Sequence, residues 1–362
     1  MSRSLAALAA FAVLVPAAGR PVDLADTRLV SDPASSGSLL AFAYGGDLWV
    51  AGTDGAGVRR LTSHPGVESG PRFSPDGSLI AFTGRYEGNT DVYVVPAAGG
   101  VPRRLTYHPG TDTALGFTAD GRSVLFASAR EVSNNRYTQL FSVPTGGGFP
   151  TRLKVPNASK AAISPDGKTI AYVPLAEQFA QWKHYRGGST ARILLFDDAT
   201  HAVEAVPQPE GRCNDTDPMW VGDRLFFRSD RDGELNLYAY ERVTKAVKRL
   251  TSHSDFPVLS ASAGGGRIVY EQAGYVHSLD PASGASQRLK LGVAADLVEA
   301  RPRWVKGAKW IRSASLSPTG ARVAFEFRGE ILTVPREKGD DRNLTLSPGV
   351  HERSPAWSPD GR

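Results

Sequence analysis

The stretch Arg72–Phe82, with the sequence RFSPDGSLIAF, joins a four-residue turn to a run of apolar residues. In the turn, Pro75 presets its backbone φ, Asp76 can accept a hydrogen bond from the backbone two residues on, and Gly77 tolerates a positive φ. This chemistry predicts a tight hairpin between two β-strands rather than a ligand site.

The same turn returns along the chain, as FTADG at 117–121, ISPDG at 163–167, LSPTG at 316–320 and WSPDG at 357–361. Counted from the second residue, the first two steps are 44 and 46 residues and the last is 41. A second marker keeps the same phase, as RRLT at 59–62 and 103–106, TRLK at 151–154, KRLT at 248–251, QRLK at 287–290 and RNLT at 342–345. Two markers in phase indicate an internal structural repeat.

Each repeat contains four predicted strands. The second and third are continuous apolar runs, which indicates that both of their faces are covered. The fourth is short and rich in arginine, as expected of an outer edge that must not pair with other chains. Four-stranded sheets repeating every ~40–50 residues are typical of a β-propeller.

The predicted fold is all-β: a six-bladed β-propeller of four-stranded antiparallel blades over residues 20–293, followed by the truncated start of a second propeller. The first blade starts in RLVSDPASSG, and the next five begin near Val67, Thr111, Asn157, Arg212 and Phe256. Because each unit carries its own four strands in order, we expect the ring to close by packing between blades alone. Residues 294–310 break the repeat and are predicted to be a linker, and 311–362 are predicted to be the first blade or blades of the second propeller.

The N-terminus has the features of a secretory signal over residues 1–19. Arg3 precedes the apolar run Leu5–Val15, and Ala17 and Gly19 occupy the −3 and −1 positions of a cleavage site. A short buried first strand or helix is the alternative. The signal predicts a periplasmic or secreted protein, and no stretch is long and apolar enough to span a membrane.

Composition excludes several functional classes. The net charge of +5 comes from basic residues scattered along the chain rather than gathered in a basic arm, so nucleic acid is not a predicted partner. Cys213 is the single cysteine, which excludes an intramolecular disulfide and a cysteine-based zinc site. We predict no cofactor, no metal site and no catalytic residue in this chain.

Four longer stretches resemble the tricorn protease family: AYGGDLWVAGTDGAGVRRLTSHPG (43–66), QWKHYRGG (181–188), NDTDPMWVGDRLFFRSDRDGELNLYAY (214–240) and IRSASLSPTGARVAFEFRGEILTVP (311–335). The resemblance implies a six-bladed propeller, a seven-bladed second propeller, a PDZ domain and a serine-nucleophile core farther along the polypeptide. It also implies a hexameric assembly that cleaves short peptides, with propellers acting as gates and channels, and a cytoplasmic location in the best-known members. Because the SPDG turns are shared with TolB-like and WD40-like propellers, a stand-alone periplasmic TolB-like module that binds protein partners is the alternative.

Several polar residues were weighed as sites and assigned to structure instead. His64, His108 and His253 share one periodic slot after the RLT strand, which favours a turn role over catalysis. Asp215 and Asp217 are predicted to cap a turn rather than to form a paired-carboxylate site. The DRDGELN segment (230–236) is predicted to be a hairpin rather than a calcium loop, because it lacks the bidentate glutamate of such loops.

The segment Ala176–Thr190 inserts extra residues between the second and third strands of the fourth blade. Its aromatic and basic side chains could rim the channel and contact peptides or protein partners, and these candidate contact residues are Phe179, Trp182, Lys183, Tyr185 and Arg186. The alternative is an insertion folded down as packing for its own blade.

Overall fold

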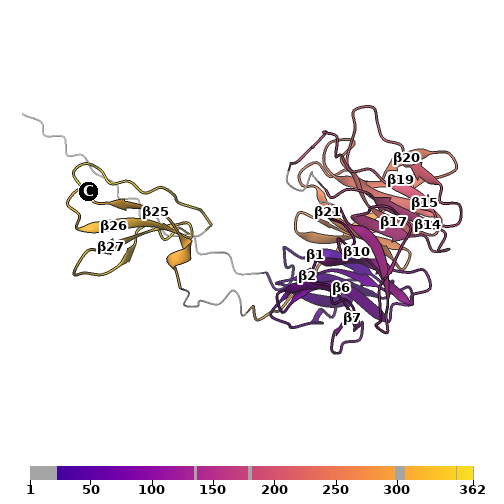
Figure 1. Cartoon of the computed structure of the whole chain (residues 1–362), viewed down its shortest axis with the longest axis horizontal. Helices are drawn as coiled ribbons and strands as arrows, with labels where there is room; N and C mark the ends of the chain where they lie inside the picture. The colour runs from indigo at the N-terminus through magenta and orange to yellow at the C-terminus, as the bar shows by residue number, and fades with distance from the viewer. Residues whose placement is uncertain (1–22, 134–136, 178–181, 298–305, 348, 362) are drawn as a thin grey trace, which may run out of the picture. The chain divides into compact units, whose positions relative to one another are not determined.

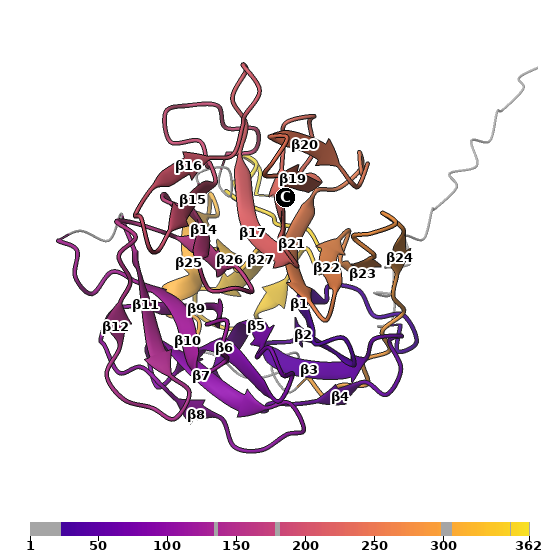
Figure 2. The ribbon, with the colours of Figure 1, turned by 90° about the vertical axis from the view of Figure 1, so that its right-hand side faces the viewer.

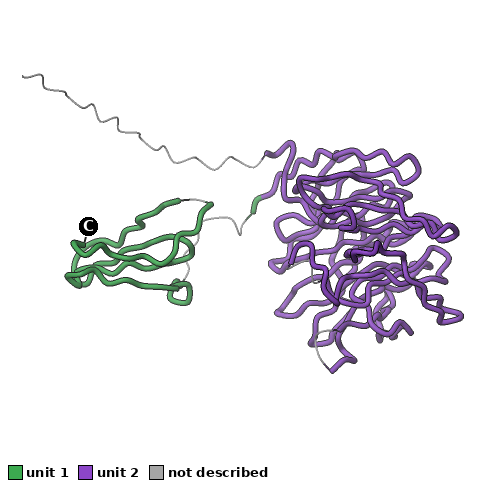
Figure 3. The backbone as a smooth tube through the Cα atoms, turned by 90° about the horizontal axis from the view of Figure 1, so that it is seen from above, with its two compact units in different colours: residues 1–21, 296–362 green, residues 22–295 purple. Residues whose placement is uncertain are grey.

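The computed structural model describes residues 23–133, 137–177, 182–297, 306–347 and 349–361, and its regular secondary structure is almost entirely β-strand (Figure 1). The chain divides into two compact units, coloured separately in Figure 3: residues 22–295 form the larger unit, and residues 296–362 belong to the smaller. The predicted signal peptide, residues 1–19, lies outside the described residues.

The larger unit contains six four-stranded antiparallel sheets, here called blades one to six, each with its strands paired in sequence order. Blades one to three are formed by β1 (Ser31–Ser35), β2 (Leu39–Tyr44), β3 (Asp47–Gly52), β4 (Arg59–Arg60), β5 (Val67–Phe73), β6 (Leu79–Tyr86), β7 (Asn89–Pro96), β8 (Arg103–Arg104), β9 (Asp112–Phe117), β10 (Ser123–Ser128), β11 (Gln139–Pro144) and β12 (Thr151–Arg152). Blades four to six are formed by β13 (Lys160–Ile163), β14 (Thr169–Val173), β15 (Leu194–Asp197), β16 (Val203–Ala205), β17 (Asp215–Val221), β18 (Arg224–Ser229), β19 (Asn236–Glu241), β20 (Ala246–Arg249), β21 (Val258–Gly264), β22 (Arg267–Gln272), β23 (Tyr275–Leu279) and β24 (Ser286–Arg288).

The blades are arranged as a ring, with the first strand of each toward the centre and the fourth toward the outside (Figure 2). The predicted all-β propeller fold of four-stranded antiparallel blades is thereby confirmed. The second and third strands are buried on both faces, as their apolar runs predicted, whereas the two arginines of β4 are exposed.

The core lies between the blades. Six clusters of buried side chains each join one blade to the next around the ring, including blade six to blade one. Successive side chains of a strand point to opposite faces of the blade and so pack against different neighbours. In β6, Phe82 packs toward blade one and Ala81 packs toward blade three. A blade therefore needs a neighbour on each side to bury its strands.

The SPDG turns have the predicted geometry. Gly77 has a φ of 74°, and the backbone N–H of Ser78 donates to Asp76 Oδ1 at 3.1 Å. The Ser74 hydroxyl also donates to Asp76 at 2.5 Å, and this bond is the main reason why the pKa of Asp76 falls to about 2. A Cβ placed on Gly77 would lie 3.2 Å from Ser36 Cβ of the preceding blade, so the turn also forms part of the interface between blades.

The RLT marker ties the fourth strand to the third. In blade two, the Thr106 hydroxyl accepts the backbone N–H of Val92 at 3.0 Å and donates to Asp91 at 3.2 Å. Arg104 completes the motif with an ion pair to Asp91 at 2.7 Å. The bonds of the threonine hydroxyl and of the arginine explain why the Arg-Leu-Thr motif recurs from blade to blade.

Ring closure differs from the prediction in one respect. Blades one and six take no strand from each other, as expected. The interface between them is nevertheless closed by backbone hydrogen bonds as well as by packing. Just before β1, the N–H of Thr27 donates to Leu291 O and that of Leu29 donates to Gly274 O, both at 2.8 Å. The buried Thr27 hydroxyl also accepts the N–H of Val293 at 2.9 Å. The prediction missed this because the segment before β1 carries no repeat marker.

The smaller unit has one sheet, formed by β25 (Ile311–Leu316), β26 (Arg322–Phe327), β27 (Glu330–Pro335) and β28 (Arg342–Asn343), after a short 3₁₀ turn, η3 (Ala308–Trp310). Beyond β28, Glu352 N–H donates to Gly329 O at 2.9 Å, and Trp357 Nε1 donates to Ser315 O at 2.9 Å. The ring has the same kinds of contact between consecutive blades, from Glu68 N–H to Gly46 O and from Trp220 Nε1 to Ala162 O. This unit's assignment to a second propeller stays a prediction.

Candidate functional site: the axial cavity and the blade-four insertion

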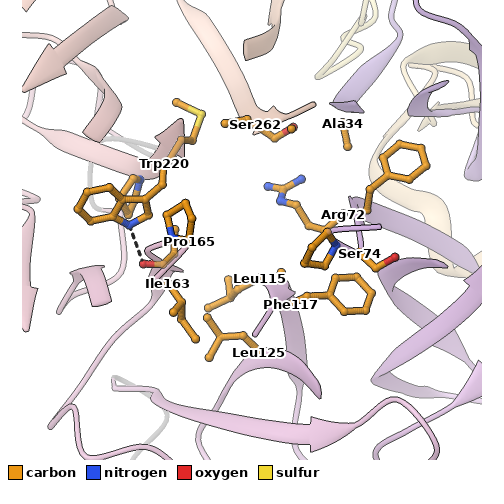
Figure 4. Close-up of a pocket in the computed structure, with 18 of the residues that line it drawn as sticks. Ala34, Arg72, Ser74, Leu115, Phe117, Leu125, Ile163, Pro165, Trp220 and Ser262 are labelled. Atoms are coloured by element: carbon orange, nitrogen blue, oxygen red, sulfur yellow. Dashed lines mark hydrogen bonds between the residues drawn. The ribbon is translucent and has the colours of Figure 1, made fainter. Parts of the chain in front are cut away.

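A cavity of 310 Å³ lies on the axis of the ring and is lined by the first strand of every blade. Much of its wall consists of backbone and small side chains, namely Ala34, Ser35, Gly116, Ala161, Ala162, Ala261, Ser262 and Gly264. Figure 4 shows the guanidinium of Arg72 extending into this space, with Leu115, Phe117 and Ile163 on the wall below it. The Arg72 Nη1 atom donates to Pro71 O at 2.8 Å.

Three of the inner strands carry a β-bulge built on the same tripeptide pattern. The segments are Ser-Asp-Pro at 31–33, Ser-Gly-Pro at 69–71 and Thr-Asp-Pro at 216–218, and each coincides with a shift of register against the second strand. Their middle residues, Asp32, Gly70 and Asp217, have φ values of 50°, 59° and 47°. A bulge re-aims side chains that a regular strand would alternate between its two faces.

Asp217 is the centre of a buried ionic network at the cavity wall. Its carboxylate lies 2.5 Å from Arg228 Nε and 3.2 Å from Lys160 Nζ. Burial disfavours the charged carboxylate, but the two cations outweigh burial and hold the pKa of Asp217 well below its usual range. The predicted turn-capping role of Asp217 and Asp215 is therefore wrong. Both lie within β17, where Asp217 occupies the bulge and Asp215 pairs with Arg231 at 3.0 Å.

The network reaches the insertion through Glu177. Glu177 Oε1 lies 3.7 Å from Arg228 Nη2 and also accepts the Thr216 hydroxyl. The carboxylate of an insertion residue is thus joined to the same arginine that holds Asp217 at the cavity. Local motif patterns could not reveal this link, because about 50 residues separate Glu177 from Arg228.

The insertion residues predicted to contact partners are placed differently from one another. Trp182 is 55% exposed, and its ring centroid lies 6.2 Å from that of the half-buried Tyr185. Lys183 forms an ion pair with Glu234 at 2.6 Å, and Arg186 forms one with Asp230 at 2.7 Å. Phe179 lies outside the described residues.

Both ion pairs join the insertion to blade five rather than to its own blade. Asp230 also accepts two hydrogen bonds from Asn214, one from its backbone N–H at 2.7 Å and one from its Nδ2 at 2.8 Å. Asn214 Nδ2 donates in addition to Tyr185 O at 3.0 Å. The insertion is therefore anchored across the interface between blades four and five, with Trp182 left toward solvent.

Other residues considered in the sequence have structural roles. The Nδ1 atoms of His64 and His108 accept the N–H groups of Gly66 and Gly110, each at 2.9 Å. His253 Nε2 lies 3.1 Å from the Tyr270 hydroxyl. The DRDGELN segment joins β18 to β19 as the predicted hairpin.

Within the part of the chain that the structure describes, no group of three or more histidine, cysteine, aspartate or glutamate side chains could hold a metal ion. No helix among the same residues is long and apolar enough to cross a membrane.

Comparisons with known proteins agree with this architecture. Residues 27–285 match the family described as the tricorn protease N-terminal beta propeller domain. Tricorn protease homolog 1 of Streptomyces coelicolor is 33% identical over 327 residues, which cover 89% of this chain and 30% of that protein. The tricorn protease homolog of Saccharolobus solfataricus is 26% identical, with 91% of this chain and 30% of that protein covered.

Among solved structures, the crystal structure of the tricorn protease superposes with a TM-score of 0.73 at 22% identity. The match covers 88% of this chain and 31% of that one. The chain thus spans about 30% of the length of these curated relatives.

Proposed function

Since the chain belongs to the tricorn protease family through its N-terminal β-propeller domain, we propose that its propeller gates and channels peptides for proteolysis. Peptide-bond cleavage would occur in a serine-nucleophile core outside this chain, joined to it through a second propeller and a PDZ domain, in a hexameric assembly. Export by the N-terminal signal is part of the same proposal.

The axial cavity is the observation that supports a channelling role. Its wall takes residues from all six blades and combines backbone and small side chains with larger ones such as Arg72, Phe117 and Trp220. Such a wall offers hydrogen-bond partners to a peptide backbone and, in the Arg72 guanidinium, a cation that extends into the space. A conduit for peptides needs both the space and these polar partners.

Photo-crosslinking tests the proposal. The purified chain is illuminated with an acetylated and amidated Gly/Ala heptapeptide that carries a central benzoylphenylalanine, and the adducts are mapped by mass spectrometry. We expect adducts on cavity residues such as Leu115, Ile163 and Ser262. The variant Ile163→Trp, which fills the cavity, should lose most of these adducts, whereas Val203→Trp on the exposed outer strand β16 should keep them.

Adducts confined to outer strands, or adducts that Ile163→Trp leaves unchanged, would overturn the channelling role. Capture of folded proteins without any adduct in the cavity would instead favour the stand-alone binding module.

A further inference from the structure

A second cavity, of 410 Å³, lies where the insertion meets blade five. Its polar lining comes from the insertion, from β18 and from the β18–β19 hairpin, and its apolar lining comes mainly from Leu235, Pro257 and Leu259. The carboxylates in the lining are those of Glu177, Asp230 and Glu234.

Glu234 has one oxygen in use and one without a partner. Its Oε1 atom accepts Lys183 Nζ at 2.6 Å and lies 3.9 Å from His184 Nε2. Its Oε2 atom is buried and has no hydrogen-bond partner within the described residues. A buried carboxylate oxygen left without a donor is costly, so a ligand that supplies an N–H to this atom gains that energy on binding.

The other two carboxylates are already engaged. Glu177 is held by Arg228, and Asp230 is held by Arg186 and by two bonds from Asn214. Glu234 differs because Lys183, the cation at 2.6 Å from it, has a side chain that is 61% exposed. Such a surface ion pair is worth about 0–1 kcal/mol, so Lys183 can turn into solvent at little cost.

The shape of the cavity suits an extended basic group. An ammonium placed against Glu234 would donate hydrogen bonds to both carboxylate oxygens once Lys183 moves out. The methylene groups behind the ammonium would lie along Leu235, Pro257 and Leu259, in the way that lysine stems cover apolar surfaces. Because Glu177 and Asp230 are already paired with arginines, the carboxylate of Glu234 decides the preference, and it favours a cation over an inorganic anion or an acidic side chain.

We propose that this cavity binds an ammonium group of a peptide, from either a lysine side chain or the N-terminus, with Glu234 as its acceptor and Lys183 as the competitor that it displaces. This inference rests on the proposed peptide-handling function and adds the chemistry by which peptides are selected.

Calorimetric titration of the full chain with three pentapeptides tests the inference. The first is acetylated and amidated with a central lysine, the second replaces that lysine with norleucine, and the third has a free N-terminus and a central norleucine. The first or the third peptide should bind at least tenfold more tightly than the second, and the peptide that does so identifies the source of the ammonium. Raising the salt concentration should reduce the difference.

Two variants should change this affinity in opposite directions. Glu234→Gln removes the acceptor charge and should weaken binding of the ammonium peptide by about tenfold or more. Lys183→Met removes the competing cation and should tighten binding several-fold. Glu210→Gln, at an exposed carboxylate outside the cavity lining, is the charge-matched control and should leave the affinity unchanged.

The outcomes separate this site from the proposed function. Equal binding of all three peptides would overturn the ammonium site and leave the channelling role standing, and no binding of any peptide would overturn both. If Glu234→Gln fails to fold, Lys183→Met still decides: a weakened or unchanged affinity in that variant contradicts the displacement of Lys183.

Discussion

At the scale of single residues, Asp217 shows how a buried charge is kept in this fold. Removing a carboxylate from water is unfavourable, and the structure compensates with Arg228 at 2.5 Å and Lys160 at 3.2 Å. Burial alone would raise the pKa of Asp217, and the two cations reverse that direction and lower it.

Replacing Asp217 with asparagine should lower the free energy of unfolding by about 3 kcal/mol or more at pH 7, because the buried Arg228 and the partly exposed Lys160 lose their anion. The folded pKa of Asp217 lies below the unfolded value, so its stabilisation is complete above about pH 3.9 and is lost as the pH falls below it. The deficit of the variant relative to the parent should therefore shrink by about 1.4 kcal/mol for each pH unit below that point.

Urea unfolding of both proteins between pH 7 and pH 3 measures this change. Asp198→Asn, at an exposed position, is the matched control and should stay within about 0.5 kcal/mol of the parent. A deficit that grows toward low pH would contradict the ionised assignment.

Replacing Gly77 with alanine should cost about 1–2 kcal/mol, because the residue has a φ of 74°. The new Cβ would also lie 3.2 Å from Ser36 Cβ of the neighbouring blade. Gly211→Ala, where the backbone φ is not positive and no atom lies within 4 Å of the added Cβ, is the control. Equal shifts of the melting temperature in the two variants would refute the turn assignment.

At the scale of elements, the insertion between β14 and β15 is held by charge rather than by its aromatic rings. Arg186 pairs with the nearly buried Asp230, whereas Trp182 is more than half exposed. The predicted alternatives, a channel rim or packing for its own blade, did not include this anchoring on the next blade.

We expect Arg186→Ala to destabilise the chain by about 2 kcal/mol or more, because Asp230 would lose its cation while remaining buried. Trp182→Ala should change stability by less than about 0.5 kcal/mol. Thermal unfolding of the two variants checks the contrast, and a larger loss from Trp182→Ala would return the insertion to the core of its own blade.

The order of strands could be predicted because repeated local chemistry marks it: each of the SPDG-type turns has its glycine at a positive φ, and each RLT threonine bonds the third strand. The contacts of the insertion could not be predicted, because Arg186 and Asp230 are 44 residues apart in the chain and no periodic signal links them. The shared tripeptides at 31–33, 69–71 and 216–218 are a sequence signal for the bulges, because they fall at the same position in three first strands.

At the scale of the whole molecule, the seam between blades one and six closes the ring. Thr27→Val keeps the shape of the side chain but leaves the N–H of Val293 without its acceptor in a buried site. We expect a loss of about 1–3 kcal/mol and faster cleavage near residues 23–30 in limited proteolysis. Unchanged stability and unchanged protease resistance would show that packing alone closes the ring.

The purified chain should not hydrolyse peptides, since the candidate histidines His64, His108 and His253 each have a structural contact. Mass spectrometry of the heptapeptide after incubation with the chain checks this expectation. Cleavage that co-purifies with the chain through several columns and is lost on heat unfolding would place a catalytic centre in this region.

Each blade is formed by four consecutive strands, and this affects how such a ring can change by gene duplication. Here every sheet takes its four strands from one continuous segment, so an in-frame duplication of about 44 residues adds a whole blade with both interfaces intact. The number of blades can then change without any strand finding a new partner, and the cost falls on the curvature of the ring.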